Sequence, residues 1–300
     1  MLSVKRLVAD NLPNAKPELW ANVGGVIWRR LSTWANTKLD HGWPDRPMIA
    51  TIRPGGLMLE VIPRDVIGAP IAQFGIFEFA VTQLLRAYLS PGDVFVDVGA
   101  NIGYYSVIAG GIVGSAGRVI AFEPSARVRA RLERNIALNA MAELVEVRPE
   151  AVSNEDGLVR LVEPMNVNND GLAYIDVRGN SSGVEVPAIR LDAVNELTAR
   201  PPALLKVDVE GGEPNVYRGA AGLLSQPEAP SILFESFEIA RDAEMLRALG
   251  YQIYQPQLRD RKVRLVQDLT LPRYRHWEAP NYLAVKSARG QRFVAGLLLK

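Results

Sequence analysis

Cysteine is absent from the 300-residue chain, and histidine occurs only twice, at His41 and His276. The lack of cysteine excludes disulfides, thiolate metal sites and a cysteine nucleophile, and it is typical of a reducing compartment. No stretch approaches the roughly 20 apolar residues of a membrane-spanning helix. The start of the chain has no long apolar run before Asp10 and Pro13, so a signal peptide is not expected. We therefore expect a cytoplasmic protein without stable membrane insertion.

The sequence also lacks a dominant sign of charge. Its 34 lysine and arginine residues balance 33 aspartate and glutamate residues, for a formal net charge of +1. Such a chain offers no bulk attraction for nucleic acid or for an anionic membrane. The hydrophobic fraction of 48% and the charged fraction of 22% are typical of a soluble globular protein. We expect no nucleic-acid partner.

Residues 1–70 differ in composition from the rest and are expected to form an N-terminal extension. Four of the five tryptophans lie before residue 47, and an apolar face recurs there at helical spacing, at Trp20, Val23, Ile27, Leu31 and Trp34. Such a helix would pack on the main domain or on a second subunit of a homodimer. Peripheral membrane contact and stacking on a sugar ring are the alternatives. Two strand-like stretches then flank Gly55 and Gly56, which predicts a β-hairpin.

From about Phe77 onward, helix-like and strand-like segments alternate, which predicts a largely parallel sheet with right-handed crossovers. The predicted strands are VFVDV, RVIAFE, LVEVRP, ALLKVDV, SILFES, YQIYQP and NYLAVK. Helices are expected at about 77–88, 104–113, 126–139 with Ser125 as N-cap, 214–224 and 242–250. We assign residues 71–290 to this domain. Within it, turn-rich polar sequence predicts an inserted hairpin or flap at about 152–190.

Two glycines follow the first of these strands, in VFVDVGANIGYYS. Gly99 and Gly103 would lie beyond the carboxyl end of that strand, where open parallel sheets bind their ligands. The next strand ends in Glu123, at a place where an acid commonly receives both hydroxyls of a ribose. A lone Gly-x-x-x-Gly is more often only a tight turn. Together with Glu123, it predicts a site for an adenosine-containing cofactor.

The residues of the turn favour one class of cofactor. A dinucleotide site needs the closer glycines of Gly-x-Gly-x-x-Gly, but the residue between the two glycines is Asn101. Asp97 would repel a diphosphate, and it suits a cofactor that carries an ammonium group and a sulfonium cation. We therefore expect S-adenosylmethionine, with the two glycines admitting its methionine part against the backbone, and methyl transfer as the reaction.

A second polar cluster lies in LLKVDVEGGEPNVYRGA. Side chains alternate along a strand, so Lys206, Asp208 and Glu210 share one side at its carboxyl end. Glu213 begins the next helix, where the helix dipole favours a negative group. A salt-bridged strand end with a helix cap is the structural alternative. Four charges that converge at the end of one buried strand favour a functional site.

These motifs resemble those of the FkbM family of S-adenosylmethionine-dependent methyltransferases. VFVDVGANIGYYS resembles the family's first motif, IAFEP its second, and LLKVDVEGGEPNVYRGA its most distinctive one, K-[IV]-D-[IV]-E-G-x-E. The segments FGIFE, RLERNIALN, PEAVS and RLDAV support the resemblance, which extends from about Phe74 to Lys286. It implies an α/β fold of the class I Rossmann-like type. Such a fold has a mostly parallel seven-stranded sheet, helices on both faces and an antiparallel last strand, here NYLAVK.

The resemblance also implies roles for individual residues. The cofactor-binding residues would be Asp97, Gly99, Asn101, Gly103, Glu123, Glu150, Ala151 and Asp208. Among these, Glu123 would hold the ribose, Glu150 and Ala151 would lie near the adenine, and Asp208 near the methionine end. Family members mostly methylate hydroxyls of sugars, glycolipid headgroups or other secondary metabolites, so the expected acceptor is a small molecule or a glycan. Phe77 stands where the family more often has tyrosine, so a contribution from that hydroxyl would be missing.

Loss of the acceptor's proton calls for a positioned base. The catalytic candidates are Asp208, Glu210, Glu213 and Glu78, and Glu235 at the end of SILFES and His276 are further possibilities. A cluster of carboxylates could instead hold Mg²⁺. The spacing does not decide between these uses, and no residue is assigned as a metal ligand.

Two rival functions are alternatives. A nicotinamide-dependent oxidoreductase would need closer glycines than Gly99 and Gly103, and it leaves the acidic cluster unexplained. A catalytically silent module that binds carbohydrate or a partner protein would keep the fold, but the intact acidic motif argues against loss of activity.

Overall fold

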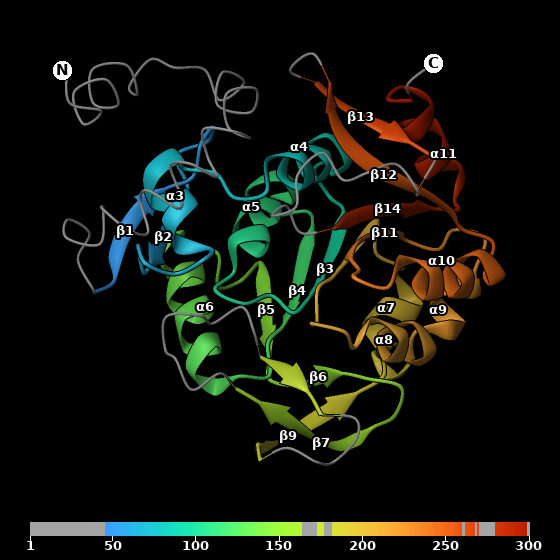
Figure 1. Cartoon of the computed structure of the whole chain (residues 1–300). Helices are drawn as coiled ribbons and strands as arrows, with labels where there is room; N and C mark the ends of the chain where they lie inside the picture. Colours follow the sequence, from blue (N-terminus) through green and yellow to red (C-terminus); the bar gives the residue numbers. More distant parts are fainter. Residues whose placement is uncertain are drawn as a thin grey trace.

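An eight-stranded sheet forms the centre of the molecule (Figure 1). The computed structural model describes residues 46–163, 173–176, 182–259, 262–267, 269 and 280–298. The expected tryptophan-bearing helix, His41 and His276 lie outside these residues. In order across the sheet, the strands are β13 (Lys262–Val266), β12 (Gln252–Arg259), β14 (Asn281–Val285), β11 (Ser231–Glu235), β10 (Leu204–Val207), β3 (Val94–Val98), β4 (Arg118–Phe122) and β5 (Val145–Arg148).

The pairing of these strands confirms the mostly parallel sheet. β3 pairs in parallel with β4 and β10, and the same direction continues to β5 and β11. β14 is antiparallel to both β11 and β12, as expected for NYLAVK. The predicted number of seven strands is wrong, because β13 folds back on β12 as an eighth strand, with Arg259 opposite Lys262. Burial of Leu265 holds this short strand at the sheet edge.

Helices cover both faces of the sheet, also as expected. One face packs against α4 (Phe79–Tyr88), α5 (Tyr104–Val113), α6 (Ala126–Leu138) and α11 (Ala288–Ala295), and the other against α7 (Asn195–Ala199), α8 (Glu213–Gly219), α9 (Ala221–Ser225) and α10 (Ile239–Ala248). Alternating strand residues supply the two cores, as when Phe95 faces the first helical layer and Val96 the second.

Several helical segments differ from the prediction. The helix expected at 214–224 is divided at Ala220 into α8 and α9, and α10 begins at Ile239. The helices α3 (Gly68–Phe74), α7 and α11 were not predicted. The N-cap at Ser125 is confirmed, because its hydroxyl accepts a hydrogen bond from the Val128 backbone nitrogen at 3.3 Å. None of the described helices combines the length and apolar character that crossing a bilayer requires.

The β1 (Met48–Thr51) and β2 (Met58–Val61) hairpin is attached to α6 by two asparagines one helical turn apart. Asn139 exchanges hydrogen bonds with the backbone nitrogen and carbonyl of Met58, at 2.9 and 2.7 Å. Asn135, which is fully buried, accepts from the backbone nitrogen of Glu60 at 2.6 Å and donates to the carbonyl of Ile102 at 2.8 Å. The hairpin and the glycine turn are therefore held by the same side chain.

A second, smaller sheet connects β5 to β10 and lies at the lower edge of Figure 1. Its order is β6 (Ala151–Val152), β9 (Val184–Ile189), β7 (Gly157–Val162) and β8 (Tyr174–Ile175). A small core of Ala151, Leu161 and Val186 holds it together. The 3-10 helix η2 (Leu191–Ala193) leads from this sheet back to α7. Parts of the predicted flap, at 164–172 and 177–181, lie outside the described residues.

The turn after β3 depends on a close approach of two backbones. Gly99 has a φ angle of 80°, and a Cβ atom added there would clash with the carbonyl oxygen of Asp208. Gly103 has a φ of 87°, and its Cβ would clash with the side chain of Leu132. The protein itself therefore comes close to both glycines on the side where a Cβ atom would stand. Contact of these glycines with a cofactor stays a prediction.

Replacing Gly99 with alanine should therefore destabilise the fold through both strain and a backbone clash. We expect the free energy of unfolding of Gly99→Ala to fall by about 3–5 kcal/mol in urea titrations. Gly56→Ala is the matched control, since its φ is also positive at 73° but no atom lies near the added Cβ. That control should lose only about 1–2 kcal/mol. Equal losses in the two variants would contradict the clash.

Candidate functional site

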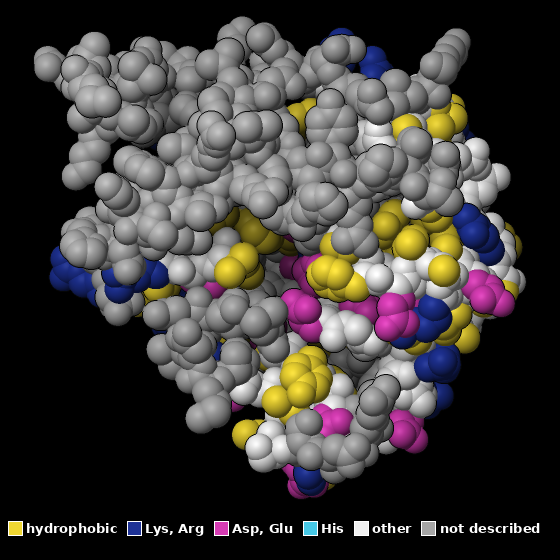
Figure 2. All heavy atoms as spheres, viewed as in Figure 1, with side chains coloured by type: hydrophobic (Ala, Val, Ile, Leu, Met, Phe, Trp, Pro, Cys, Tyr) yellow, Lys and Arg dark blue, Asp and Glu magenta, His cyan; other side chains and the backbone are white. Residues whose placement is uncertain are grey.

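Acidic side chains converge at the carboxyl ends of β3, β4, β10 and β11. Figure 2 shows acidic side chains gathered near the middle of the face viewed, with hydrophobic side chains on either side. The strand register brings the groups together, because β10 lies between β3 and β11, with Lys206 beside Asp97 and Val207 beside Phe234. Sequence positions far apart thereby meet at one edge of the sheet.

Asp97 is the penultimate residue of β3 and is 1% exposed. Its Oδ2 accepts a hydrogen bond from the Ser106 hydroxyl at 2.7 Å, whereas Oδ1 has no hydrogen-bond partner among the described residues. Burial raises the pKa of Asp97, and the ammonium group of Lys206 opposes that rise. An unpartnered buried acceptor at this point fits a cationic or hydrogen-bond-donating group of a ligand.

Glu123 lies directly after β4 and faces the glycine turn. Its Oε2 accepts from the Asn101 backbone nitrogen at 3.0 Å, and its Oε1 accepts from the Ser125 backbone nitrogen at 2.9 Å. Each oxygen keeps a second lone pair, so the carboxylate can still accept two hydroxyls. Burial raises the pKa of Glu123 to about 7, against the effect of these hydrogen bonds.

Glu150 and Ala151 follow β5, beside the end of β4. Arg148 holds the Glu150 carboxylate at 2.8 and 3.3 Å, and these hydrogen bonds keep the pKa of Glu150 below its ordinary value. Ala151 is buried as the first residue of β6. Arg129, which the sequence reasoning missed, donates to the carbonyl of Glu123 at 2.9 Å. Its charge opposes the rise in the pKa of Glu123 and adds to the lowering of the pKa of Glu150.

Lys206 supplies the positive charge in the middle of the acids and is 3% exposed. Its Nζ lies 2.8 Å from Oδ2 of Asp208 and 4.8 Å from the centre of the Tyr105 ring. Burial lowers the pKa of Lys206, but the carboxylates of Asp208, Asp97 and Glu78 raise it by more, so the group stays charged. Sequence alternation predicted the shared side of Lys206 and Asp208, but not the ring.

Glu78 reaches the same cluster from the residue before α4. Its Oε2 accepts from the Tyr105 hydroxyl at 2.5 Å and its Oε1 from Nδ2 of Asn281 at 2.6 Å. Burial raises the pKa of Glu78, and Lys206 opposes the rise. Both oxygens of Glu78 are therefore engaged, and the two donors come from α5 and from the start of β14.

Glu213 is the first residue of α8 and is buried. Its Oε1 accepts from the backbone nitrogens of Val209 and Gly211, both at 3.2 Å. Burial raises the pKa of Glu213, against these backbone hydrogen bonds. This carboxylate holds the turn that follows β10, so the structure places it in a supporting position.

Glu210 and Glu235 are the uncommitted acids of the cluster, since neither carboxylate forms a hydrogen bond or ion pair within the described part of the chain. Burial and the neighbouring Asp208 and Glu213 raise the pKa of Glu210 to about 7. Burial and the neighbouring Asp208 and Glu78 raise the pKa of Glu235 well above its ordinary range. Free carboxylates with raised pKa values in a partly buried cluster are candidates for proton transfer.

Backbone strain also concentrates here. The described residues other than glycine with positive φ are Glu78 (40°), Asn101 (50°), Ala140 (55°) and Glu210 (52°), and three of these belong to the site. The left-handed conformation is unfavourable for side chains that carry a Cβ, and it persists where surrounding contacts enforce it. Such strain at three polar residues supports a functional role.

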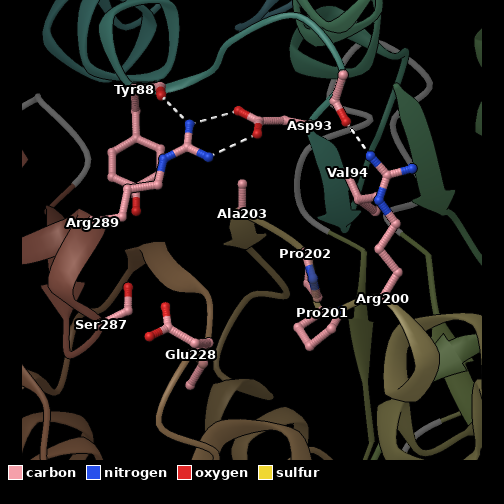
Figure 3. Close-up of a pocket in the computed structure, with 12 residues that line it drawn as sticks. Tyr88, Asp93, Val94, Arg200, Pro201, Pro202, Ala203, Glu228, Ser287 and Arg289 are labelled. Atoms are coloured by element: carbon pink, nitrogen blue, oxygen red, sulfur yellow. Dashed lines mark hydrogen bonds and ion pairs between the residues drawn. The ribbon is translucent and has the colours of Figure 1, made fainter. Parts of the chain in front are cut away.

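A separate pocket of about 250 Å³ lies at the opposite ends of the strands, where β3 and β10 begin (Figure 3). Arg289 spans it, with ion-pair contacts to Asp93 at 2.6 and 2.7 Å and a hydrogen bond to the Tyr88 carbonyl at 2.7 Å. Arg200 donates to the Gly92 carbonyl on the other side. These contacts anchor α11 to the start of β3, and the acids described above lie at the other edge. We therefore place the candidate site at the carboxyl edge.

Sequence reasoning missed the neutral side chains that organise the site. Tyr105 was visible only as part of an apolar helix, and Asn281 only as the first residue of the last strand. The signal for Asn281 is its place in an antiparallel strand, which starts at the edge where the parallel strands end. The described residues contain no group of three or more side chains arranged to hold a metal ion.

Comparison with known proteins gives one family match. A family model described as the methyltransferase FkbM domain matches residues 97–253. None of the curated proteins compared with the chain matches it.

Several solved structures are similar at low identity. A methyltransferase FkbM from Methylobacillus flagellatus KT is 17% identical, with a TM-score of 0.43, over 65% of this chain and 44% of that one. A SAM-dependent O-methyltransferase from Thermotoga maritima is 14% identical, with a TM-score of 0.39, over 84% and 81%. Fibrillarin from Aeropyrum pernix, in complex with natively bound S-adenosyl-L-methionine, is 13% identical, with a TM-score of 0.37, over 68% and 72%. This chain thus spans less than half the length of the Methylobacillus chain.

The raised pKa of Glu123 predicts a pH dependence of stability. The native protein keeps this proton up to about pH 7, whereas the unfolded chain loses it near its ordinary value of about 4.3. Stability should therefore fall as the pH rises through this window. The fall between pH 5 and pH 7.5 should be smaller by about 2 kcal/mol in Glu123→Gln than in wild type, measured by urea unfolding without added ligand.

Two features of this experiment isolate Glu123. The lost backbone acceptor lowers the stability of Glu123→Gln at every pH, so the change between the two pH values is the informative quantity. Glu228→Gln, at an exposed carboxylate on the opposite edge, is the matched control variant. An unchanged pH dependence in folded Glu123→Gln would contradict the assignment.

Proposed function

The chain belongs to the FkbM methyltransferase family, and from that premise we propose that it methylates a hydroxyl oxygen of a sugar, a glycolipid headgroup or another secondary-metabolite-type small molecule. The family match covers more than half of the chain, and it makes S-adenosylmethionine the cofactor. The observation that supports O-methylation is the free Glu210 carboxylate, with its pKa raised to about 7, in the turn that follows β10, the strand that pairs with β3.

The residues of the first turn have the chemistry to hold this cofactor. Glu123 has two free lone pairs for the ribose hydroxyls, and Asp97 has the unpartnered Oδ1 for the ammonium group. Asn101 and Gly103 shape the turn, and Glu150 and Ala151 follow β5, on the side proposed for the adenine. When bound, the cofactor supplies an electrophilic methyl group on a sulfonium centre.

Among the candidate bases, the contacts favour Glu210. Both oxygens of Glu78 accept hydrogen bonds, and Glu213 holds two backbone nitrogens. Asp208 is paired with Lys206. The carboxylate of Glu210 is uncommitted, and a pKa near the working pH allows it to take a proton from the acceptor hydroxyl and return it to solvent. Glu78, Glu213 and Asp208 then act as positioning residues, with Asp208 at the methionine end of the cofactor.

The rival functions have less support. A nicotinamide-dependent oxidoreductase does not agree with the family of the chain, and the glycine spacing does not suit a diphosphate. A catalytically silent module would not need an uncommitted acid on strained backbone at Glu210. Calorimetric titration with S-adenosylmethionine and with NAD separates the first rival, and a test for methyl transfer separates the second.

The proposed partners and compartment rest on composition and on the family. We propose a cytoplasmic location, because the chain contains no cysteine. A small molecule or glycan is the proposed acceptor, and nucleic acid is not a proposed partner. Peripheral membrane contact or a homodimer through the tryptophan-bearing segment stays a proposal, since that segment lies outside the described residues.

Glu123→Ala should weaken the binding of S-adenosylmethionine by about 2 kcal/mol, or roughly 30-fold, because a charged acceptor for two hydroxyls is lost. Isothermal titration calorimetry measures the change, and circular dichroism checks that the variant is folded. Unchanged affinity in a folded variant would exclude Glu123 as the ribose ligand.

Glu210→Gln should separate proton transfer from cofactor binding. We expect turnover to fall by about 10²–10⁴-fold while affinity for S-adenosylmethionine changes little. Asp208→Asn is the matched comparison, and it should weaken cofactor binding but keep most of the turnover at saturating cofactor. S-adenosylhomocysteine formation is measured with an acceptor chosen by screening glycosides and other hydroxylated metabolites. Near-normal turnover of Glu210→Gln at every pH would rule out Glu210 as the base.

A further inference from the structure

Glu235 is an acid of this site that the proposed reaction does not use. It is the last residue of β11, and its strand neighbour on one side is Asn281 of β14. On the other side, Phe234 is in register with Val207 of β10, so Asp208 and Glu235 follow side by side at the carboxyl edge. Two carboxylates therefore lie side by side at the ends of adjacent strands, and we call this pair the Asp208–Glu235 row.

Among the described residues, the surroundings of Glu235 contain more negative than positive charge. The charged groups that act on it are Lys206 from β10, Asp208 directly after that strand, Glu210 from the next turn, and Glu78 from the residue before α4. Lys206 is the one cation among them, and it is already paired with Asp208 at 2.8 Å and packed on the Tyr105 ring. Glu235 itself is partly buried, and its carboxylate accepts no hydrogen bond from the described residues.

The same edge also contains an acceptor suited to a cation. Asp97 is almost completely buried, and its Oδ1 has no partner among the described residues. The turn that follows Asp97 touches the row directly, because Gly99 packs against the carbonyl oxygen of Asp208. A positive ligand bound at this turn would therefore act on the Asp208–Glu235 row at short range.

We propose that Glu235 carries a proton before the cofactor binds and releases it to solvent when the cationic cofactor arrives, so that its carboxylate becomes available to the acceptor only in the loaded site. This inference rests on the proposed function, since it takes S-adenosylmethionine as the ligand of the turn. The step is a simple proton transfer, in which the carboxylic acid gives a carboxylate and the proton passes to the buffer.

Elementary electrostatics gives the direction of this coupling. Like charges disfavour ionisation of Glu235, and burial and the carboxylates of Asp208 and Glu78 raise its pKa to about 9. An added positive charge nearby favours the ionised form and lowers that pKa. By linkage, a proton released on binding makes the cofactor bind more tightly as the pH rises. The ionised Glu235 would then be a second acceptor for the hydroxyl compound, beside Glu210.

Calorimetry in two buffers of different ionisation enthalpy measures the protons released on binding. At pH 8.0, wild type should release close to one proton more per S-adenosylmethionine than Glu235→Gln does. S-adenosylhomocysteine has the same amino group but no sulfonium charge, so its binding should show a much smaller difference between the two proteins. Glu210→Gln should keep most of the release, and Glu228→Gln, at the opposite edge, should match wild type.

The outcomes separate this inference from the function on which it rests. If S-adenosylmethionine binds wild type and Glu235→Gln with the same proton count, the proton is not on Glu235 and the inference is overturned alone. If wild type does not bind S-adenosylmethionine, the proposed function fails and the inference fails with it. If Glu235→Gln does not fold, the pH dependence of cofactor binding by the wild type still tests the inference. The wild-type preference for S-adenosylmethionine over S-adenosylhomocysteine should rise several-fold per pH unit from pH 7 to 8.5, and a flat preference overturns the inference.

Discussion

One buried ammonium group holds the acidic edge of this protein together. Lys206 is almost inaccessible to solvent, and its charge offsets the carboxylates of Asp97, Asp208 and Glu78. Removing one partner from a buried ion pair leaves an uncompensated charge, which is far more costly than losing an exposed pair. The positions of β3, β10 and α4 at the carboxyl ends of the strands therefore depend on the Lys206 side chain. The ring of Tyr105 packs against its ammonium group.

The second constraint is mechanical rather than electrostatic. Asn135, fully buried on α6, forms hydrogen bonds with the backbone of the hairpin at Glu60 and with the backbone of the turn at Ile102. A hydrogen-bonded side chain of this kind has little freedom, because each unsatisfied group would carry a desolvation penalty. The N-terminal hairpin is thereby part of the scaffold of the site.

The sequence could predict those parts of the structure that follow from local pattern. The alternation of strand-like and helix-like segments along the chain predicted the strands VFVDV and NYLAVK, and Ser125 predicted the start of α6. The eighth strand, Lys262–Val266, was missed although KVRLV alternates polar and apolar residues, because a five-residue edge strand is defined by its pairing with β12. The reason for Gly99 was also missed, since the carbonyl of Asp208 comes from a distant part of the chain. Contacts between strands decide such features, and a single sequence does not display them.

Glu210 occupies a backbone conformation that glycine would adopt more easily, and its carboxylate forms no hydrogen bond with the described residues whose loss would offset the gain. Selection of this protein for heat resistance alone would therefore favour glycine at this position, because the strain of the left-handed conformation would be relieved. The same exchange would delete the carboxylate that we propose as the base. Glu78 has similar strain, but its hydrogen bonds to Tyr105 and Asn281 and its charge beside Lys206 would be lost with it.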